Sequence, residues 1–467
     1  MCSASLSSRF EALRVRASAL ALEDGAARKA RLARLAQVFD AHRGRLAEAL
    51  TADLGRHPME SELIELHPTA CELRHAQRRV KGWMQPRRVG TPLTLLGTRS
   101  WIHPEPKGVV LILAPWNYPI FLLLGPLVAA LAAGNAVMVK PSEKAPATER
   151  ALAELLREAF PDGEVDVATG GPDVAEALLE LPWNHVFFTG STRIGQRVMA
   201  AAARHLTPVT LELGGKSPAV VTASADLDQA ATRLAWGKLV NAGQTCVAPD
   251  YLLVHADVLP TFLERLKARF EAQAGAAPLD NPDYASLVDD AAFARQQALL
   301  DGAVAAGATV VCGGTGDAAR RRLAPTVLTG VPLDHPLMRE EIFGPLLPVL
   351  AYRSDAEALA VIRALDEPLS LYVFAGTRAE EQDWIRRTRA GGTGLGQTVV
   401  HLANPNLPFG GRGPSGLGAY HGEHGFWAFS HARAVLRQGL LEPLALYRPP
   451  YAGAFKRLAF RMLRWLE

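Results

Sequence analysis

Cys246 is the side chain of this chain best suited to nucleophilic chemistry. Residues 226–240, upstream of it, predict a helix with an acidic start, and Gly243 follows where a left-handed residue can end a helix. Residues 251–254, downstream of it, have the composition of a strand. We therefore expect Cys246 on an irregular connection between a helix and a strand, where a thiol can face a cleft. The alternative is a small buried hydrophobic residue, which is the usual fate of a free cysteine.

Length and composition describe an ordinary globular protein. The chain has 467 residues, which favours two or three domains, and contains 49% apolar and 21% charged residues. A formal net charge of +3 is too small to indicate a nucleic-acid partner. The four cysteines are scattered without a CxxC pair or metal spacing, and the first residues lack the apolar core of a signal peptide. We expect free thiols in a cytoplasmic protein.

From residue 108 onward, short apolar runs alternate with segments of helical periodicity. The predicted strands are 109–113, 136–139, 165–168, 185–188 and 209–213. The predicted helices between them are 121–133, 148–160, 173–181 and 194–205. This order predicts an α/β fold with a doubly wound parallel sheet, whose ligands collect beyond the carboxyl ends of its strands. Residues 120–139 are long and apolar enough for a membrane span, but Gly125-Pro126 and Gly134-Asn135 interrupt them and favour a buried helix and strand.

The remaining segments complete a three-part organisation. Residues 1–211 are predicted to form N-terminal helices and a dinucleotide-binding domain, with an arm strand at about residues 90–104. Residues 212–395 repeat the α/β pattern and are predicted to form the catalytic domain, with strands near 220, 251, 310, 346 and 371. Residues 396–467 are predicted to return to the first domain and to supply an oligomerisation segment. The glycine-rich residues 391–396 are interpreted as a hinge.

The C-terminal tail has the pattern of an amphipathic helix. Its apolar face consists of Phe455, Leu458, Ala459, Met462 and Leu466. We expect this helix to dock on the protein, over a pocket mouth or a partner subunit. Peripheral contact with a membrane surface is the alternative, because basic amphipathic helices also lie in interfaces.

Seven short motifs occur in a fixed order along the chain. They are Ala114-Pro-Trp-Asn-Tyr-Pro119, Lys140-Pro-Ser-Glu143, Phe188-Thr-Gly-Ser-Thr192, Leu211-Glu-Leu-Gly-Gly-Lys216, Gly243-Gln-Thr-Cys246, Glu340-Glu-Ile-Phe-Gly-Pro345 and Pro408-Phe-Gly-Gly411. Together they resemble the aldehyde dehydrogenase superfamily over nearly the whole chain. Segments such as Tyr420-His-Gly422 resemble its class 3 branch, which includes enzymes for fatty and aromatic aldehydes, coniferyl aldehyde dehydrogenases among them. The resemblance implies NAD(P)-dependent oxidation of an aromatic or medium- to long-chain aliphatic aldehyde to its carboxylic acid. The arm at Thr91–Ile102 and the residues after 396 suggest a homodimer.

The resemblance also implies the roles of three catalytic residues. Cys246 is the nucleophile that forms a thiohemiacetal and then a thioester, and Asn117 donates to the oxyanion. Glu212 is the general base for thioester hydrolysis, and in its predicted strand it alternates away from the apolar positions. The alternatives are a helix-capping Asn117 and an exposed carboxylate at a strand end.

For the cofactor, the resemblance places Lys140 and Glu143 at the adenosine ribose, with NAD as cofactor and NADP left open. Residues 190–195 follow a predicted strand and open a helix, so Gly190, Ser191 and Gly195 are assigned to the pyrophosphate. The resemblance further assigns Glu341 to the nicotinamide ribose and Phe343 to the wall of the ring. A surface glutamate and a core phenylalanine are the alternatives for these last two.

Candidate substrate contacts are Tyr118, Trp236 and Phe409, although each can equally be plain core. His401, His421 and His431 show no metal spacing, and no metal is expected. Two other functions stay open: a dehydrogenase that passes the acyl group to coenzyme A, and a non-catalytic dinucleotide-binding or membrane-associated protein. Glu212 favours water as the acyl acceptor, and Cys246 with Asn117 favours catalysis.

Overall fold

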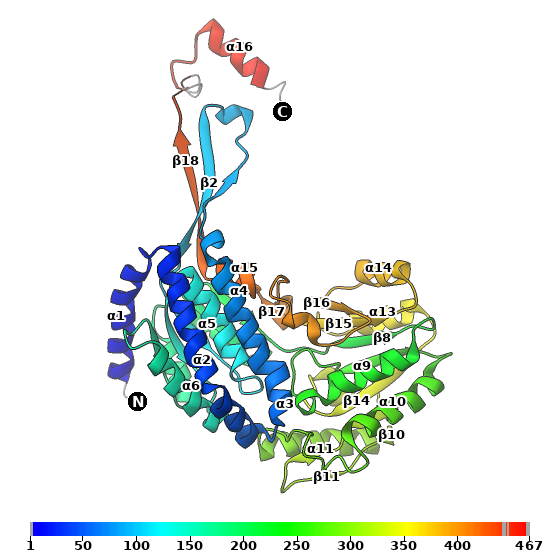
Figure 1. Cartoon of the computed structure of the whole chain (residues 1–467). Coiled ribbons are helices and arrows are strands. Elements are labelled where there is room, and N and C mark those ends of the chain that lie inside the picture. Colours follow the sequence, from blue (N-terminus) through cyan, green and yellow to red (C-terminus); the bar gives the residue numbers. More distant parts are fainter. Residues whose placement is uncertain (1–2, 441–444, 446–447, 464–467) are drawn as a thin grey trace.

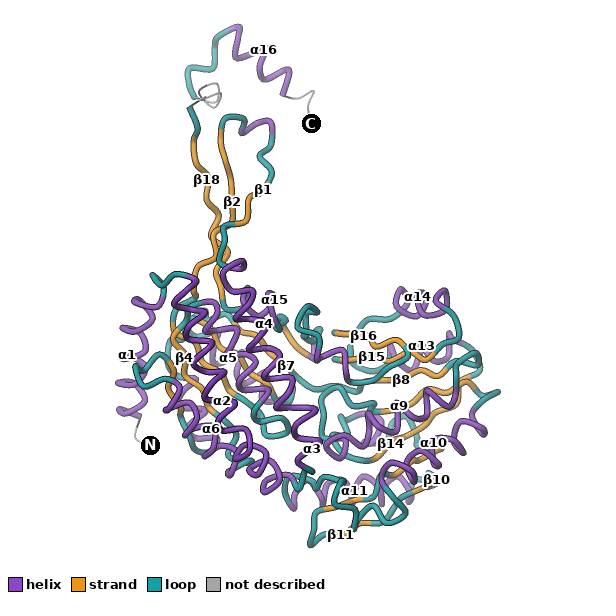
Figure 2. Tube along the Cα trace, viewed as in Figure 1, coloured by secondary structure: helices purple, strands orange, loops and turns teal. Residues whose placement is uncertain are grey.

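The computed structural model describes residues 3–440, 445 and 448–463. Two α/β units lie side by side, and a narrow β-arm projects from the first of them (Figure 1). Figure 2 shows helices packed around strands in both units. The predicted α/β fold class is confirmed.

The first unit is built on a six-stranded sheet in the order β17-β7-β6-β3-β4-β5. Its strands are β3 (Val109–Leu113), β4 (Ala136–Lys140), β5 (Val165–Val167), β6 (His185–Thr189), β7 (Val209–Glu212) and β17 (Gly416–Leu417). The five predicted strands are present and parallel, while β17 pairs antiparallel with β7 and was not predicted. Every residue of β3 and β4 is buried, as expected for parallel strands covered on both faces. Glu212 is the last residue of β7, so the predicted domain boundary falls at the rim of this sheet.

Helices cover both faces of the first sheet. They are α1 (Ser3–Leu20), α2 (Gly25–Leu54), α3 (Pro58–Ser61), η1 (Glu62–Leu66), α4 (His67–Trp83), α5 (Phe121–Ala133), α6 (Pro146–Ala159), α7 (Pro172–Leu179), α8 (Thr192–Ala203) and α15 (Gly422–Ala428). One core joins α2, α4, α5 and α6 to the sheet, and another joins α1, α7 and α8 to its opposite face. Residues 120–139, the candidate membrane span, are buried in α5 and β4. Within the described part of the chain, no helix has the length and apolar character needed to cross a membrane.

The second unit contains a seven-stranded sheet in the order β10-β13-β14-β9-β8-β15-β16. Its strands are β8 (Pro218–Val221), β9 (Tyr251–His255), β10 (Thr309–Cys312), β13 (Thr326–Thr329), β14 (Leu346–Tyr352), β15 (Ser370–Phe374) and β16 (Gly392–Leu395), beside the small pair β11 (Gly316–Asp317) and β12 (Arg322–Leu323). Its helices and turns are α9 (Leu227–Leu239), η3 (Val240–Gly243), α10 (Leu259–Ala274), α11 (Asp290–Ala305), α12 (Pro336–Arg339), α13 (Asp355–Arg363), α14 (Arg378–Arg387) and η4 (Val400–Ala403). The turn η5 (Gly413–Ser415) leads directly into β17 of the first sheet. The five strands predicted here are present. Residues 391–396, interpreted as a hinge, instead contain the edge strand β16, which pairs with β15.

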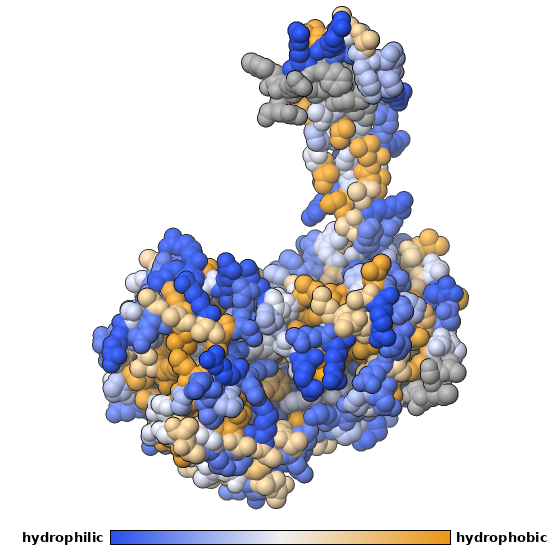
Figure 3. Space-filling model, turned by 180° about the vertical axis from the view of Figure 1, so that it is seen from behind, coloured by the Kyte–Doolittle hydropathy of each residue, from blue (hydrophilic) through white to orange (hydrophobic). Residues whose placement is uncertain are grey.

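The arm is an antiparallel sheet of three strands in the order β1-β2-β18. These strands are β1 (Arg87–Val89), β2 (Thr98–Pro106) and β18 (Ser430–Gln438), with the turn η2 (Leu93–Leu95) between the first two. Because β18 pairs with β2 along its whole length, residues after 396 complete the arm that the N-terminal part begins. Figure 3 shows apolar side chains on the surface of the arm, where it projects away from the two α/β units.

The C-terminal helix α16 (Ala454–Leu463) lies beyond the tip of the arm, away from both α/β units (Figure 1). Its predicted apolar face is open, since Phe455 is 71% exposed and Leu458 is 56% exposed. The prediction that this helix docks over a pocket of its own chain is therefore wrong. The arm holds it too far from the body. Leu466, assigned to the same face, lies outside the described residues.

Candidate active site

Cys246 lies in a turn between α9 and β9, on the irregular connection that the sequence predicts. Asn241, Ala242 and Gly243 all have positive φ, at 51°, 52° and 74°, so the chain reverses sharply after α9. A side chain at Gly243 would collide with the carbonyl of Gly344. These three left-handed residues turn the chain away from the axis of α9 before it reaches Cys246. Cys246 is half-buried there.

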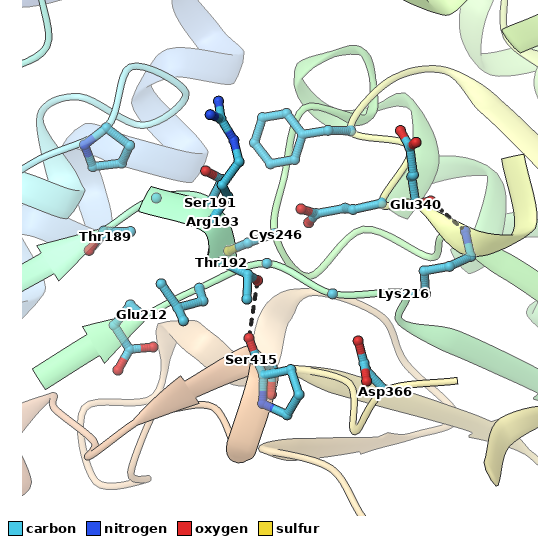
Figure 4. Close-up of a pocket in the computed structure, with 18 of the residues that line it drawn as sticks. Thr189, Ser191, Thr192, Arg193, Glu212, Lys216, Cys246, Glu340, Asp366 and Ser415 are labelled. Carbon is cyan, nitrogen blue, oxygen red and sulfur yellow. Dashed lines mark hydrogen bonds between the residues drawn. The ribbon is translucent and has the colours of Figure 1, made fainter. Parts of the chain in front are cut away.

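Two cavities meet at Cys246. The larger, of about 760 Å³, lies between the two α/β units, and its lining includes several charged side chains. The smaller, of about 300 Å³, is lined mainly by apolar side chains. Cys246 and Leu122 belong to the lining of both. Figure 4 shows Cys246 near the centre of the larger cavity, with Glu212 projecting from the end of β7. The thiol can therefore be reached from two sides by two different molecules.

Glu212 and Asn117 both line the larger cavity with Cys246. Both oxygens of the buried Glu212 carboxyl lack a hydrogen-bond partner among the described residues, and burial raises its pKa well above the ordinary value. A carboxylate that is this poorly stabilised is a strong base for a proton brought within its reach. Asn117 Nδ2 donates to the Gln244 carbonyl at 3.1 Å. This bond uses one of the two N–H groups of the Asn117 side chain. It holds the Asn117 amide against Gln244, which lies two residues before Cys246.

The surroundings of the Cys246 thiol favour its protonated form. Its pKa is raised by burial first and then by the nearby carboxylates of Glu341 and Glu212, while the backbone N–H groups of Cys246 and Val247 lower it. Attack by sulfur must therefore be coupled to the loss of a proton, because the thiolate is the nucleophile. The same N–H groups are suited to stabilise an oxyanion formed beside the sulfur.

A buried ion pair between Lys216 and Asp250 anchors the segment that carries Glu341. Lys216 Nζ donates to the Glu340 carbonyl at 3.0 Å, and Asp250 Oδ1 accepts from the Ile342 N–H at 3.0 Å. These bonds hold the backbone on both sides of Glu341, so its side chain is directed into the larger cavity.

The Glu341 carboxyl packs against the backbone of Gly214, where any larger residue would overlap it. Burial and the charge of Asp250 raise the pKa of Glu341 to about 8, against the opposing effect of the Gly215 N–H. Phe343 has a positive φ of 50°, and its ring lies 5.4 Å from that of Trp116 in an edge-on arrangement. The two rings form an apolar wall of the cavity.

The remaining cofactor candidates divide into two groups. Gly190 and Ser191 line the larger cavity where β6 leads into α8, and the Ser191 side chain makes no cap hydrogen bond. The N–H groups that begin α8 are thus open to an anion, which fits a pyrophosphate. Lys140, Glu143 and Gly195 lie outside the cavity lining. Lys140 and Glu143 form an ion pair of 2.9 Å, and Gly195 lets α8 approach the side chain of Leu213.

The smaller cavity contains all three predicted substrate residues: Tyr118, Trp236 and Phe409. The Tyr118 hydroxyl is satisfied by Thr245 Oγ1 at 2.6 Å, so it presents an apolar ring to the cavity. Most other lining residues were not predicted: Leu63, Ile64, Pro68, Phe121, Leu122, Val399, Val400, Leu402, Ala403, Tyr420 and His421. They belong to segments far apart in sequence, and apart from Tyr420 and His421 they lie outside the motifs named above. The alternation of apolar residues alone does not separate them from ordinary core.

The sequence model of the aldehyde dehydrogenase family matches residues 10–435. The chain belongs to the aldehyde dehydrogenase family. It is 43% identical over 420 residues to a probable coniferyl aldehyde dehydrogenase of Pseudomonas aeruginosa, covering 89% of this chain and 87% of that protein. It is 41% identical to the rat protein named aldehyde dehydrogenase, dimeric NADP-preferring, covering 85% of this chain and 86% of the relative. The predicted family is confirmed.

A solved structure has nearly the same fold as this aldehyde dehydrogenase. The substrate-bound AldH of Staphylococcus aureus superposes with a TM-score of 0.93 at 38% identity, covering 98% of this chain and 99% of that one. The protein is an oxidoreductase that uses NAD or NADP to oxidise an aldehyde, as the sequence predicts. Among the residues that the structure describes, no cluster of three His, Cys, Asp or Glu side chains is arranged to hold a metal ion.

Proposed function

We propose that this aldehyde dehydrogenase oxidises an aromatic or medium- to long-chain aliphatic aldehyde to the carboxylic acid, with Cys246, Glu212 and Asn117 as catalytic residues. The observation that carries this proposal is that Cys246 belongs to two cavities of different chemistry. An apolar aldehyde enters from the smaller cavity. The cofactor occupies the larger one, where the open start of α8 fits its pyrophosphate.

The reaction begins when the Cys246 thiol loses its proton to solvent water and the thiolate adds to the carbonyl carbon. The oxyanion accepts hydrogen bonds from the Asn117 side chain and the Cys246 N–H, and losing one such donor typically costs about 3 to 4 kcal/mol of barrier stabilisation. A nicotinamide held by Glu341 and Phe343 would supply the acceptor for the hydride of the tetrahedral carbon. Glu212 then takes a proton from water as the water attacks the thioester, and the Cys246 thiolate leaves with release of the acid.

The cofactor roles follow the same arrangement. Gly190 and Ser191 contact the pyrophosphate, Glu341 binds the nicotinamide ribose, and Phe343 walls the ring. Lys140 and Glu143 bind the adenosine ribose beyond the cavity, and Gly195 supports the pyrophosphate site by letting α8 pack closely.

These roles divide the chain between functions. Residues 1–211 bind the dinucleotide and residues 212–395 carry the thiol. Residues 396–467 return to the first domain and supply the oligomerisation segment. Water as the acyl acceptor is favoured over coenzyme A because the Glu212 carboxyl is free of partners among the described residues.

The decisive experiment is rapid mixing of the enzyme with excess aldehyde and NAD or NADP, over a panel from acetaldehyde to hexadecanal and cinnamaldehyde. We expect a burst of reduced cofactor, and the highest kcat/KM for aldehydes that fill the smaller cavity. Release of an acyl-coenzyme A in the presence of coenzyme A, with no acid formed, would favour the acylating alternative. The absence of any burst would refute the enzymatic assignment of Cys246.

We further propose a homodimer built through the arm and a cytoplasmic location. Exposed apolar side chains on the arm support the dimer: Val89, Leu93, Leu96, Leu436 and Leu440. The described cysteines are free thiols, which suits a reducing compartment. The open apolar face of α16 then meets either the partner subunit or a membrane surface. Sedimentation with anionic vesicles distinguishes the two, since only membrane contact transfers the protein to the pellet.

A further inference from the structure

Arg56 and Glu65 form an ion pair with no exposed surface on either side chain. Their segment follows α2 and includes the π-helical turn η1. Removing two charges from water carries a penalty that their mutual attraction often does not recover, so a buried pair is weak evidence for stability. Its contacts with neighbouring groups are therefore the informative feature.

The pair holds the segment 117–121 at both of its ends. Arg56 donates to the Asn117 carbonyl at 2.6 Å, and its guanidinium lies 5.1 Å from the centre of the Tyr118 ring. Glu65 Oε1 accepts from the Ile120 N–H at 2.6 Å and from the Phe121 N–H at 3.3 Å. Arg56, which lies between α2 and α3, and Glu65 of η1 thus satisfy backbone groups at both ends of the 117–121 segment.

The π-helical turn explains how Glu65 reaches this position. Such wide turns are rare and frequently occur at functional sites. Leu63 and Ile64 of the same turn line the smaller cavity, whereas Glu65 is fully buried against the 117–121 segment. One turn therefore contributes to the substrate wall and to the support of Asn117.

The Asn117 carbonyl receives a second bond, from Asn241 Nδ2 at 3.0 Å. Its backbone is thus fixed between the first unit and the loop that carries Cys246. The Asn117 side chain extends from this fixed backbone to the Gln244 carbonyl. A shift of the backbone would move the amide relative to the sulfur, and misplacement of about 1 Å can cost about 100-fold in rate.

We propose that Arg56 and Glu65 are a positioning pair that holds the Asn117 amide where the oxyanion forms. This inference rests on the proposed role of Asn117. Lysine at position 56 keeps the charge but lacks the planar fork that bonds a carboxylate and a carbonyl together. Glutamine at position 65 keeps the shape but removes the charge that pairs with Arg56.

The test is a double-mutant cycle on the burst rate of reduced cofactor. We expect Arg56→Lys and Glu65→Gln each to lower the burst rate about 10- to 100-fold, with the dissociation constant for NAD unchanged within about twofold. In the Asn117→Ala background, the same substitutions should lower the burst rate no further, because the group they position is gone. An equal additional loss in that background would overturn the proposal.

Arg31→Lys is the matched control, because Arg31 of α2 forms a buried ion pair with Glu164 and neither residue lines either cavity. This variant should keep the wild-type burst rate, so any general effect of disturbing a buried pair is measured separately. If Glu65→Gln does not fold, Arg56→Lys alone completes the cycle. A normal burst rate in Arg56→Lys overturns the positioning role alone. A normal burst rate in Asn117→Ala instead overturns the proposed function of Asn117 and this inference with it.

Discussion

Replacing Glu212 by glutamine separates the two halves of the proposed reaction. The substitution preserves the size of the side chain and removes its ability to take a proton. Both carboxyl oxygens lack hydrogen-bond partners among the described residues, so the change breaks none of the bonds described here. The fold should tolerate it, and any kinetic effect should report chemistry.

The expected decrease in the rate of hydrolysis follows from the role of Glu212 as a general base. A general base contributes about 100- to 10,000-fold to a proton-transfer step, so thioester hydrolysis should slow by that factor. Thiohemiacetal formation and hydride transfer do not require Glu212 as the hydrolytic base. The variant should therefore release about one equivalent of reduced cofactor per active site and then stall.

The pH dependence of stability gives a second measurement on the same variant. Burial raises the pKa of Glu212, so the unfolded chain loses this proton at a lower pH than the folded protein does. Folded wild-type enzyme is thus progressively destabilised as pH rises from the unfolded value of about 4.3 towards the folded value. The Tm of Glu212→Gln relative to wild type should increase over this range.

The assay is stopped-flow absorbance of the reduced cofactor followed by steady-state turnover, with Glu180→Gln as the control for removing a carboxylate. Glu180 lies on the surface and pairs with Arg204, so its variant should match wild type in both phases. Steady-state turnover of Glu212→Gln within about twofold of wild type would remove Glu212 from the hydrolytic step. Loss of the burst itself would show that Glu212 acts earlier, in the ionisation of Cys246.

Three further substitutions test other parts of the site and the assembly. Cys246→Ala should abolish the burst and turnover, while the dissociation constant for NAD, measured by fluorescence quenching, stays within about threefold of wild type. Residual turnover would refute the assignment of Cys246 as the nucleophile. Trp236→Ala should lower kcat/KM about 10- to 100-fold for cinnamaldehyde, because burying a large apolar side chain is worth about 1.5 to 3 kcal/mol, but have little effect with acetaldehyde. Equal losses for both aldehydes would place Trp236 outside the substrate wall. Leu436→Glu, on the exposed face of the arm, should convert the proposed dimer to a monomer in analytical ultracentrifugation. An unchanged sedimentation coefficient would exclude that face from the interface.

Local sequence patterns determined most of the first α/β unit and the positions of the main candidate residues. The predicted range of β3 and that of α5 agree with the structure at both ends, because their apolar runs are bounded by glycine or proline signals. The placement of Cys246 after a helix end was also predicted correctly, since Gly243 marks that end within a few residues. These features depend on interactions between near neighbours in the chain.

Only the tertiary structure decided which distant segments meet. The strand β17 has two residues, and it is defined by its pairing with β7 instead of by its own composition. The wall of the smaller cavity joins residues that are far apart in sequence, with no periodicity that marks them. Arg56 and Glu65 are only nine positions apart, but Arg56 bonds to Asn117, which lies 61 positions away. The helix α16 is amphipathic, as predicted, but the length of the arm decides where it lies. Packing across long sequence separations decides these contacts, and local propensity carries no information about it.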